Sequence, residues 1–428
     1  MKVLMFGWEF PPNISGGLGT ACQGMAKGLV SFNDINLTFV VPKAYGDENT
    51  QGMKFIGASE VELSHEIIAK QKYLEMSKFY EFNQHISAYT TPEQFEKTLF
   101  EQQEKLARTV RNASRGKLGF SGQYGNSLFA EISRYGVVAS ELARKEQFDV
   151  IHAHDWLTYP AGIEAKKVSG KPLVVHVHAT EYDRCGENHN RQVYDIEQKG
   201  MAIADKVITV SDFTRNIVIN KYKIPASRVV TVHNGVELTD NSSVKNLWKL
   251  GTTDKIVTFL GRITKQKGPE YFVKAAHLVL QKMDNVRFVM AGSGDLMQDM
   301  VKYAARLNIS DKFHFTGFLK GNDVYRMYAM SDLYIMPSVS EPFGISPLEA
   351  MQCNVPVIIS KQSGVSEVIK HAIKVDFWDV EALANAIYGV LNYTSLANHL
   401  KNYSKKEVNQ LTWDKAAAKI KAVYYQVA

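Results

Sequence analysis

Short runs of apolar and β-branched residues recur along the chain, and amphipathic stretches separate most of them. In the first half these runs cover residues 3–6, 37–41, 150–152, 173–177, 207–210 and 229–232. In the second half they cover residues 256–260, 286–291, 313–316, 333–336 and 355–359. Parallel strands that are buried on both faces read as continuous apolar runs, with helices between them. The pattern predicts two α/β units in tandem.

The stretch between the two series is polar, rich in turn residues and weakly periodic, which predicts a domain boundary near residues 234–253. We expect an N-terminal domain over residues 1–240 and a C-terminal domain over residues 250–405. Residues 60–117 break the alternation, because they read as charged helix with nine Lys and Arg against nine Glu. Such a balanced set usually marks solvated helix faces. The other interpretation is an insertion that shapes an acceptor site or a partner surface.

Composition narrows the class of protein. The 428 residues carry a net charge of +6 that is not gathered into a basic run, so we expect no nucleic-acid partner. Cys22, Cys185 and Cys353 are widely spaced and form no C-x-x-C, which argues against a disulfide framework or a zinc site and favours the cytoplasm. No stretch of 18 residues reads as a membrane span, so we expect no integral membrane association.

A glycine-rich turn follows the first predicted strand. Gly16, Gly17 and Gly19 precede apolar positions at helical spacing, so glycines open a helix there. The N–H groups at a helix start favour an anion, and a phosphate or a sugar could bind at this turn. Cys22 stands where the dinucleotide fingerprint G-x-G-x-x-G needs its third glycine or alanine, so that interpretation is weak. A tight turn for helix packing alone is the other interpretation.

Two cations flank a predicted helix start in the second series. Arg262 and Lys267 follow a strand, and Pro269 stands in the first helical turn, where proline is favoured. A guanidinium and an ammonium together suit a diphosphate whose charge grows as a bond to it breaks. The alternative is two solvated basic residues beside Lys265. The next strand ends in a Gly-Ser-Gly turn at Gly292, where backbone N–H groups could approach a phosphate.

Two carboxylates, Glu341 and Glu349, lie eight residues apart after another predicted strand. Glu341 falls in a loop, where it could accept hydrogen bonds from sugar hydroxyls. The segment from Ser346 to Glu349 has the form of a capping box, Ser-Pro-Leu-Glu. Glu349 could therefore close the start of a helix, and this structural role does not exclude a ligand.

Histidines gather at the ends of two neighbouring predicted strands. The segment HAHDW holds His152, His154, Asp155 and Trp156, and the next strand holds His176 and His178. Strand alternation puts each pair of histidines on one side, which suits either a metal cluster or recognition of a sugar. The acidic ligands that a hydrolase H-x-H site needs cannot be placed, and D-x-D occurs nowhere in the chain. We therefore expect no metal.

The segments SGGLGTA, HAHDW, GRITKQKG and EPFGISPLE, in this order, resemble the retaining nucleotide-sugar glycosyltransferases of the GT-B fold with an E-x7-E motif, and among them the glycogen and starch synthases. The resemblance covers nearly the whole chain apart from residues 60–117. It implies an α/β fold of two Rossmann-like domains facing an interdomain cleft. It implies that the C-terminal domain holds the donor and the N-terminal domain most of the acceptor. Residues 406–428 look like the family's last helix, which returns to the N-terminal domain.

The resemblance also implies roles for single residues. Arg262 and Lys267 would bind the donor diphosphate, Glu341 the transferred sugar and Glu349 the ribose, and His178 would lie beside the reacting carbon. The remaining expected positions are donor-binding backbone at Gly16, Gly17, Gly292 and Gly344, and an acceptor side at His154, Asp155 and Trp156. These assignments predict a catalytic site made of Arg262, Lys267, Glu341 and His178.

The activity implied by the resemblance is transfer of glucose from ADP-glucose or UDP-glucose to an α-glucan or oligosaccharide, with retention and without a cofactor or a metal. Ile14 stands where ADP-glucose-dependent bacterial relatives usually carry the lysine of K-x-G-G-L, so the donor base stays open. One alternative is a cell-envelope glycosyltransferase with a lipid-linked or oligosaccharide acceptor. The other is a glycan- or nucleotide-binding protein without turnover.

Overall fold

The computed structural model describes the chain except for residues 15, 51, 65–66, 69–115, 126 and 238–252. Most of the predicted charged helical segment, residues 60–117, therefore lies outside the described residues. Most of the predicted domain boundary, residues 234–253, also lies outside them.

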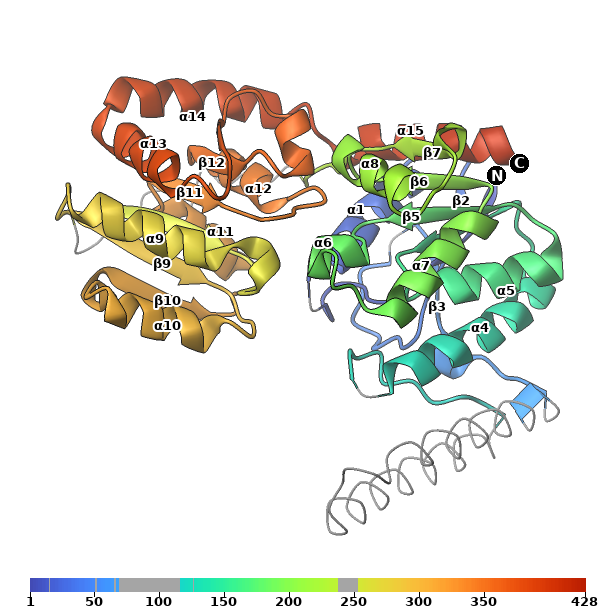
Figure 1. Cartoon of the computed structure of the whole chain (residues 1–428). Helices are drawn as coiled ribbons and strands as arrows, with labels where there is room; N and C mark the ends of the chain where they lie inside the picture. Colours follow the sequence, from blue (N-terminus) through green and yellow to red (C-terminus); the bar gives the residue numbers. More distant parts are fainter. Residues whose placement is uncertain (15, 51, 65–66, 69–115, 126, 238–252) are drawn as a thin grey trace, which may run out of the picture. The chain divides into compact units, whose positions relative to one another are not determined.

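The first sheet has the strand order β3-β2-β1-β4-β5-β6-β7 (Figure 1). Its strands are β1 (Lys2–Phe6), β2 (Asn36–Val41), β3 (Lys54–Gly57), β4 (Val150–His154), β5 (Leu173–Val177), β6 (Lys206–Thr209) and β7 (Val229–Thr231). Among the described residues of this part, the helices are α1 (Gly17–Val30), α4 (Leu128–Lys145), α5 (Tyr159–Ser169), α6 (Glu181–Cys185), α7 (Arg191–Ile203) and α8 (Asp212–Asn220). The ladders from β3 through β5 are parallel.

The second sheet has the order β10-β9-β8-β11-β12-β13, and all its ladders are parallel. Its strands are β8 (Lys255–Leu260), β9 (Val286–Ala291), β10 (Phe313–Gly317), β11 (Leu333–Met336), β12 (Val357–Ser360) and β13 (Ile373–Val375). The helices that follow them are α9 (Pro269–Leu280), α10 (Met297–Arg306), α11 (Asn322–Met330), α12 (Ser346–Gln352), α13 (Val380–Asn392), α14 (Thr394–Val408) and α15 (Trp413–Val427). The predicted pair of parallel α/β sheets is confirmed.

The central strand β11 shows why these segments read as unbroken apolar runs. Leu333 and Ile335 face one hydrophobic cluster, to which α9 contributes Phe272. Tyr334 faces a second cluster on the other side of the sheet, to which α12 contributes Leu348. Both faces of the strand are therefore buried under side chains, and no polar alternation remains in the sequence.

The chain divides by its internal contacts into two compact units. The first unit comprises Met1–Val177, Asp195–Ile208 and Ile420–Ala428, and the second comprises His178–Tyr194 and Thr209–Lys419. The residue ranges that we predict for the domains stay a prediction.

The end of α15 belongs to the first unit and is held there by polar contacts. The Tyr424 hydroxyl lies 2.6 Å from Nδ1 of His152, and both side chains are fully buried. Nearer the surface, Lys421 donates a hydrogen bond of 2.6 Å to Asp34, and the Tyr425 hydroxyl donates one of 2.9 Å to the same carboxylate. A strand histidine and an early loop thus both contact the C-terminal helix.

We expect Tyr424→Phe to lower the free energy of unfolding by about 1–2 kcal/mol, because it leaves a buried imidazole nitrogen without its hydroxyl partner. Chemical denaturation of both proteins measures the difference. Tyr425→Phe is the matched control, since that ring is 54% exposed, and its effect should stay below about 0.5 kcal/mol. Equal effects of the two substitutions would contradict the prediction.

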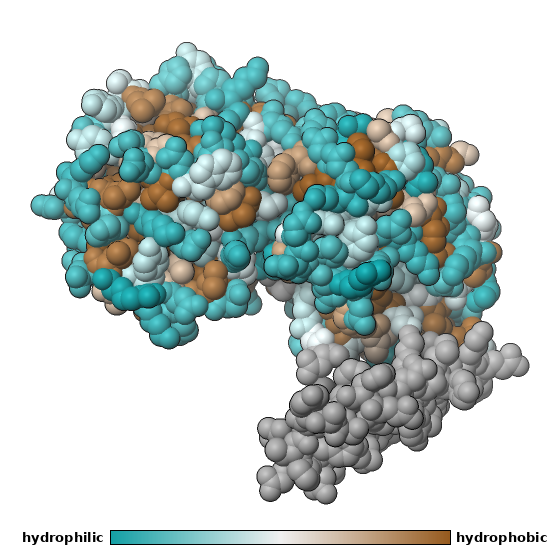
Figure 2. All heavy atoms as spheres, viewed as in Figure 1, coloured by the Kyte–Doolittle hydropathy of each residue, from teal (hydrophilic) through white to brown (hydrophobic). Residues whose placement is uncertain are grey.

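None of the helices among the described residues is long and apolar enough to cross a membrane. Figure 2 shows hydrophobic residues in patches among hydrophilic ones on the face drawn there.

Candidate active site

The predicted cation Lys267 and the predicted carboxylate Glu341 contact each other. Lys267 ends the short 3-10 turn Lys265–Lys267 after β8, and its ammonium donates a hydrogen bond to the Glu341 carboxylate. Their side chains are 21% and 7% exposed. Ser338 donates a second hydrogen bond, of 3.3 Å, to the same carboxylate oxygen. A nearly buried anion is thus neutralised by a cation that remains partly open to solvent.

Gly268 allows this turn to lie against the loop after β11. Its φ is +65°, and a Cβ at this position would lie 2.2 Å from the carbonyl oxygen of Pro337. A side chain is therefore excluded both by the left-handed backbone and by the contact. The glycine places Lys267 at the start of α9.

The loop that carries Glu341 is fixed on both sides by its backbone. The amide of Val339 donates to the carbonyl of Gln266, and the Gln266 side-chain amide donates 3.1 Å to the carbonyl of Ser340. The amide of Glu341 donates to the carbonyl of Gln362, and the amide of Gly364 donates back to Glu341. The carboxylate is therefore presented from a backbone that is bonded to the turns after β8 and β12.

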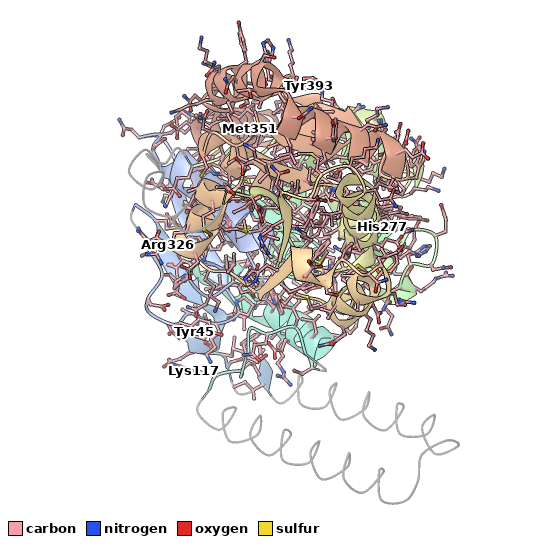
Figure 3. The ribbon with its side chains drawn as sticks, turned by 90° about the vertical axis from the view of Figure 1, so that its left-hand side faces the viewer. Tyr45, Lys117, His277, Arg326, Met351 and Tyr393 are labelled. Carbon is pink, nitrogen blue, oxygen red and sulfur yellow. The ribbon has the colours of Figure 1, made fainter. Side chains whose placement is uncertain are left out.

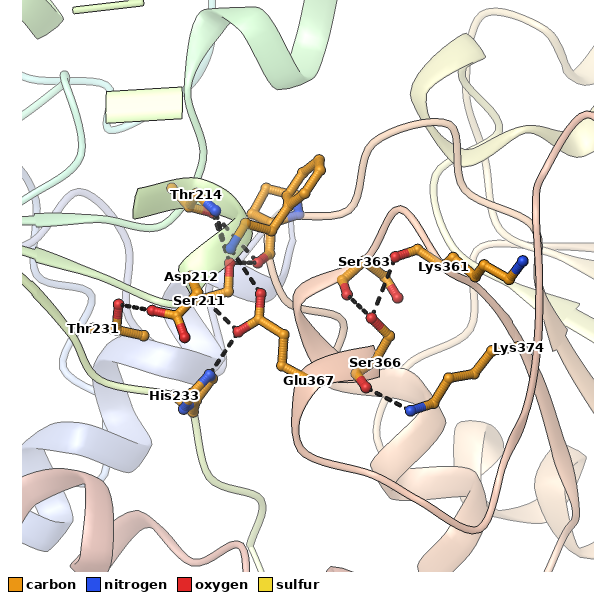
Figure 4. Close-up of polar contacts among 12 residues, drawn as sticks. Ser211, Asp212, Thr214, Thr231, His233, Lys361, Ser363, Ser366, Glu367 and Lys374 are labelled. Atoms are coloured by element: carbon orange, nitrogen blue, oxygen red, sulfur yellow. Dashed lines mark hydrogen bonds and ion pairs between the residues drawn. The ribbon is translucent and has the colours of Figure 1, made fainter. Parts of the chain in front are cut away.

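A second polar network holds the neighbouring segment of this loop (Figure 4). The carboxylate of Glu367 accepts hydrogen bonds of 2.9 and 2.7 Å from the amides of Asp212 and Phe213, the first residues of α8. The same carboxylate lies 2.7 Å from Nε2 of His233. Ser211 donates to the carbonyl of Pro342, the residue after Glu341. The start of α8 is thus bonded to the loops that follow β11 and β12.

Glu349 lies on α12 in a different environment from Glu341. The Tyr328 hydroxyl donates a hydrogen bond of 3.3 Å to its carboxylate. Loss of hydration raises the pKa of Glu349, although the tyrosine hydrogen bond acts in the opposite direction.

The predicted capping box around Glu349 is wrong. Ile345 is the N-cap of α12, and Ser346 is already inside the helix. The hydroxyl of Ser346 accepts a hydrogen bond of 2.8 Å from the buried Tyr334 hydroxyl, while the amide of Glu349 donates to the carbonyl of Ile345. The buried Tyr334 hydroxyl has two acceptors within hydrogen-bond distance, the Ser346 hydroxyl and the Leu260 carbonyl at 3.2 Å.

The raised pKa of Glu349 predicts a pH effect on stability. A carboxyl group whose folded pKa lies above its ordinary value of 4.5 destabilises the fold progressively as the pH rises above that value. We therefore expect Glu349→Gln to gain in melting temperature relative to the unsubstituted chain between pH 4.5 and pH 7. Thermal melts across this range measure the gain, with Glu381→Gln, which removes an exposed carboxylate, as control. A melting-temperature difference that is constant with pH would contradict the expectation.

The other donor-side positions of the second unit have mixed surroundings. Arg262 is exposed and lies three residues before the 3-10 turn Lys265–Lys267. The amide of Gly292 donates 2.8 Å to the carbonyl of Gly317, and a Cβ on Gly292 would lie 1.8 Å from the carbonyl oxygen of Gly261. Close packing of two loops thus explains this glycine without a ligand. Gly344 has a φ of +96° and packs against Met336.

The glycine turn of the first unit begins α1 as predicted. Gly16 is the N-cap with an extended backbone, and a Cβ on Gly16 or Gly17 would meet no atom within 4 Å. The amide of Gly19 donates 3.2 Å to the buried carboxylate of Glu9. Glu9 is therefore the anion bonded to the third glycine of the turn, and the first two glycines face open space.

The HAHDW segment spans the end of β4 and the turn after it. Asp155 has a φ of +57°, and its amide donates 2.9 Å to the carbonyl of His176. His154 is fully buried, and Trp156 is half-buried, with its ring 5.7 Å from that of Phe129. His178 follows β5 in the second unit, and burial lowers its pKa to about 3, so its imidazole is neutral at pH 7.

Two groups of side chains among the described residues of the single units are close enough to hold a metal ion. His152, His154 and His176 are buried together, with one ring nitrogen of each within 4.8 Å of the others. The second group is Asp212, His233 and Glu367, in which the Glu367 carboxylate is already bonded to two amides. The absence of a catalytic metal stays a prediction.

Two family models match successive parts of the chain. The model described as "Glycosyl transferases group 1" matches residues 242–407, and the model described as "Glycosyltransferase Family 4" matches residues 102–240. Together the two models match most of the chain, which is therefore a glycosyltransferase with one domain of each family.

Known proteins are similar to this glycosyltransferase over most of its length. An uncharacterized glycosyltransferase of Methanocaldococcus jannaschii is 28% identical, over 99% of this chain and 98% of its own. The Escherichia coli UDP-Gal:alpha-D-GlcNAc-diphosphoundecaprenol alpha-1,3-galactosyltransferase is 27% identical, over 66% of this chain and 77% of its own.

A solved structure shows the same fold. HepE of Anabaena, in complex with UDP and glucose, has a TM-score of 0.66 at 18% identity and covers 100% of both chains. The expected GT-B architecture of two parallel-sheet α/β domains is confirmed by this likeness.

Several residues around the candidate site of this glycosyltransferase were not predicted from the sequence. Gln266 and Ser338 bond to the loop around Glu341, and Glu367 bonds to the start of α8; Ser338 and Glu367 belong to no recognisable motif. Gln266 lies inside the GRITKQKG segment, and this position was the one available signal.

Proposed function

We propose that this glycosyltransferase transfers glucose from UDP-glucose or ADP-glucose to an α-glucan with retention of configuration. The observation that carries the proposal is the contact between Lys267 and Glu341. A cation suited to a phosphate and a carboxylate suited to sugar hydroxyls lie together at the carboxyl ends of parallel strands, where α/β sheets bind their ligands.

The proposed site uses the two charges in different ways. Lys267, with Arg262, stabilises the negative charge that develops on the departing diphosphate. Glu341 accepts hydrogen bonds from the hydroxyls of the transferred sugar, and Glu349 does so from the ribose. Gly344, Gly16 and Gly17 allow the donor to approach the backbone. The amide of Gly292 is bonded to a carbonyl, so we assign this glycine to loop packing.

The proposed bond changes need no protein nucleophile. The bond between the anomeric carbon and the diphosphate oxygen breaks, and the acceptor hydroxyl oxygen bonds to that carbon on the same face. The acceptor proton goes to the departing phosphate oxygen. His178 is neutral at pH 7, so beside the anomeric carbon it acts as a hydrogen-bonding group and adds no positive charge. His154, Asp155 and Trp156 line the acceptor side in this proposal.

We expect transfer to be independent of a divalent metal, because two fixed cations can neutralise the diphosphate. Donor consumption should stay within about twofold of its initial rate after treatment with EDTA and removal of the chelated ions. Activity that is lost on chelation and returns with one added metal would contradict the expected metal independence. It would indicate a metal site at His152, His154 and His176.

A second acceptor class has support from a relative. The E. coli relative acts by its name on a diphosphoundecaprenol-linked sugar. A lipid-linked or oligosaccharide acceptor is therefore the alternative. The three free thiols favour a reducing compartment in either case, and we propose the cytoplasm.

Two measurements test the proposed function. A thermal-shift screen with UDP-, ADP- and GDP-sugars should show a rise in melting temperature for the true donor, since it binds only the folded state. Incubation with that donor in labelled form, maltoheptaose and a diphosphoundecaprenol-linked sugar identifies the acceptor. Labelled maltooligosaccharide supports the glucan assignment, whereas label only in the lipid-linked sugar establishes the alternative. Absence of any donor consumption would reject the enzyme assignment.

A further inference from the structure

Aromatic side chains gather where strands of the first sheet end. Trp8 comes two residues after β1, Tyr45 comes four residues after β2, and Trp156 comes two residues after β4. These three strands are neighbours in the order β2-β1-β4, and their parallel ladders bring their carboxyl ends to one edge. This edge is the usual ligand side of an open α/β sheet.

Two further rings come from the segment before and at the start of α4. The Tyr124 ring lies 6.5 Å from that of buried Trp8, and the Phe129 ring lies 5.7 Å from that of Trp156. Tyr45, Tyr124 and Phe129 are 46%, 49% and 41% exposed. Their exposed ring surface belongs to no core and is available to a ligand. We name these five residues the aromatic edge.

The loop that presents Tyr45 is built by hydrogen bonds. Glu48 accepts hydrogen bonds of 2.8 and 2.9 Å from the amides of Tyr45 and Gly46. The Tyr45 hydroxyl donates 3.3 Å to the carbonyl of Ser121, in the segment that carries Tyr124. Figure 3 labels Tyr45 in this N-terminal part of the chain. The ring is thus held in place before any ligand arrives.

The polar groups beside the rings restrict the class of ligand. A small pocket here is lined by Trp8, Glu9, Phe10, Asn13, Lys43, Tyr45, Glu48 and Gly122. Two of these residues are carboxylates and one is a cation, and the ammonium of Lys43 lies over the Tyr45 ring, 4.8 Å from its centre. A phosphorylated ligand would meet net negative charge. The Glu48 carboxylate already accepts two backbone amides and the Asn13 amide already donates to Asp47, but carboxylate oxygens can accept further hydrogen bonds from sugar hydroxyls.

We propose that the aromatic edge binds the sugar rings of a neutral oligosaccharide acceptor, which stack on Tyr45 and Tyr124. This inference rests on the proposed function and specifies its acceptor: a glycan chain, contacted at several sugars, in place of a phosphorylated or lipid-diphosphate group. The aromatic faces supply apolar contact, and the polar rim orients the hydroxyls.

Calorimetric titration of the full chain with maltoheptaose and with chitohexaose, without donor, tests this. We expect one of these neutral glycans to bind, and we expect Tyr45→Ala and Tyr124→Ala each to raise its Kd about tenfold. Tyr45→Phe keeps the ring and should bind nearly as the unsubstituted chain does. Tyr393→Ala, which removes a ring that is 58% exposed in the second unit, is the matched control (Figure 3).

Donor binding, measured as the thermal shift of the same variants with the identified nucleotide sugar, separates this inference from the proposed function. We expect it to be unchanged in the tyrosine variants. Normal glycan binding by the Tyr45→Ala, Tyr124→Ala double variant would overturn the aromatic edge and leave the enzyme assignment intact. Binding of vesicles that contain undecaprenyl diphosphate, together with no binding of either glycan, would also overturn the aromatic edge. Absence of donor binding in the unsubstituted chain, with no donor consumption in the presence of either acceptor, would instead reject the proposed function.

Discussion

Lys267→Ala should lower the rate of sugar transfer about 100-fold or more, because it removes charge stabilisation that grows as the diphosphate departs. Arg262→Ala should have a similar effect on the rate. Lys265→Ala is the matched control, since Lys265 is an exposed lysine of the same 3-10 turn. Its rate should stay within about twofold of the unsubstituted enzyme. Steady-state kinetics with the identified donor measures all three variants.

The two active-site variants should differ in stability. Removing Lys267 leaves the nearly buried Glu341 without its cation, so Lys267→Ala should also lower the free energy of unfolding, by about 1–3 kcal/mol. Arg262 is exposed, and its removal should change stability by less than about 0.5 kcal/mol. A folded double variant with near-normal turnover would reject the assignment of both cations to the donor site.

Gly268→Ala should be strongly destabilising, by about 3 kcal/mol or more, because two penalties fall on one position. The backbone there is left-handed, and the added Cβ would lie 2.2 Å from the carbonyl oxygen of Pro337. The loop that leads to Glu341 would have to move, so the activity of the remaining folded protein should also fall. Denaturant unfolding at constant pH measures the first effect.

Gly170→Ala measures the cost of the left-handed backbone without a steric contact. Gly170 ends α5 with a φ of +69°, and a Cβ there would meet no atom within 4 Å. It should therefore cost about 1 kcal/mol, the strain of the left-handed backbone alone. Equal losses of unfolding free energy in Gly170→Ala and Gly268→Ala would show that the contact with Pro337 does not constrain the turn.

The sequence predicted the buried strands well but missed two of the four edge strands. The β11 segment is apolar at every position because both of its faces are covered. By contrast, β3 and β13 lie at the edges of their sheets, are three or four residues long and are largely half-buried. Their residues include lysines, so no continuous apolar run marks them.

The residues of the candidate site could also be predicted only in part. Lys267 and Glu341 could be predicted because each belongs to a motif, and the structure brings them into contact. Glu367 and Ser211 could not, because their role depends on α8 meeting loops more than 130 residues away. The capping box at Ser346 was wrong because α12 begins one residue earlier than the motif implies, with Ile345 as its N-cap, and the Ser346 hydroxyl instead accepts a hydrogen bond from buried Tyr334.

Proton NMR of the reaction with the identified nucleotide sugar and maltoheptaose tests the central claim most directly. The anomeric signals of donor and product report both the transfer and its stereochemistry. We predict an α-linked product from an α-configured donor, formed by the unsubstituted enzyme and the Lys265→Ala control and lost in Lys267→Ala. A β-linked product, or equal rates with and without Lys267, would contradict it.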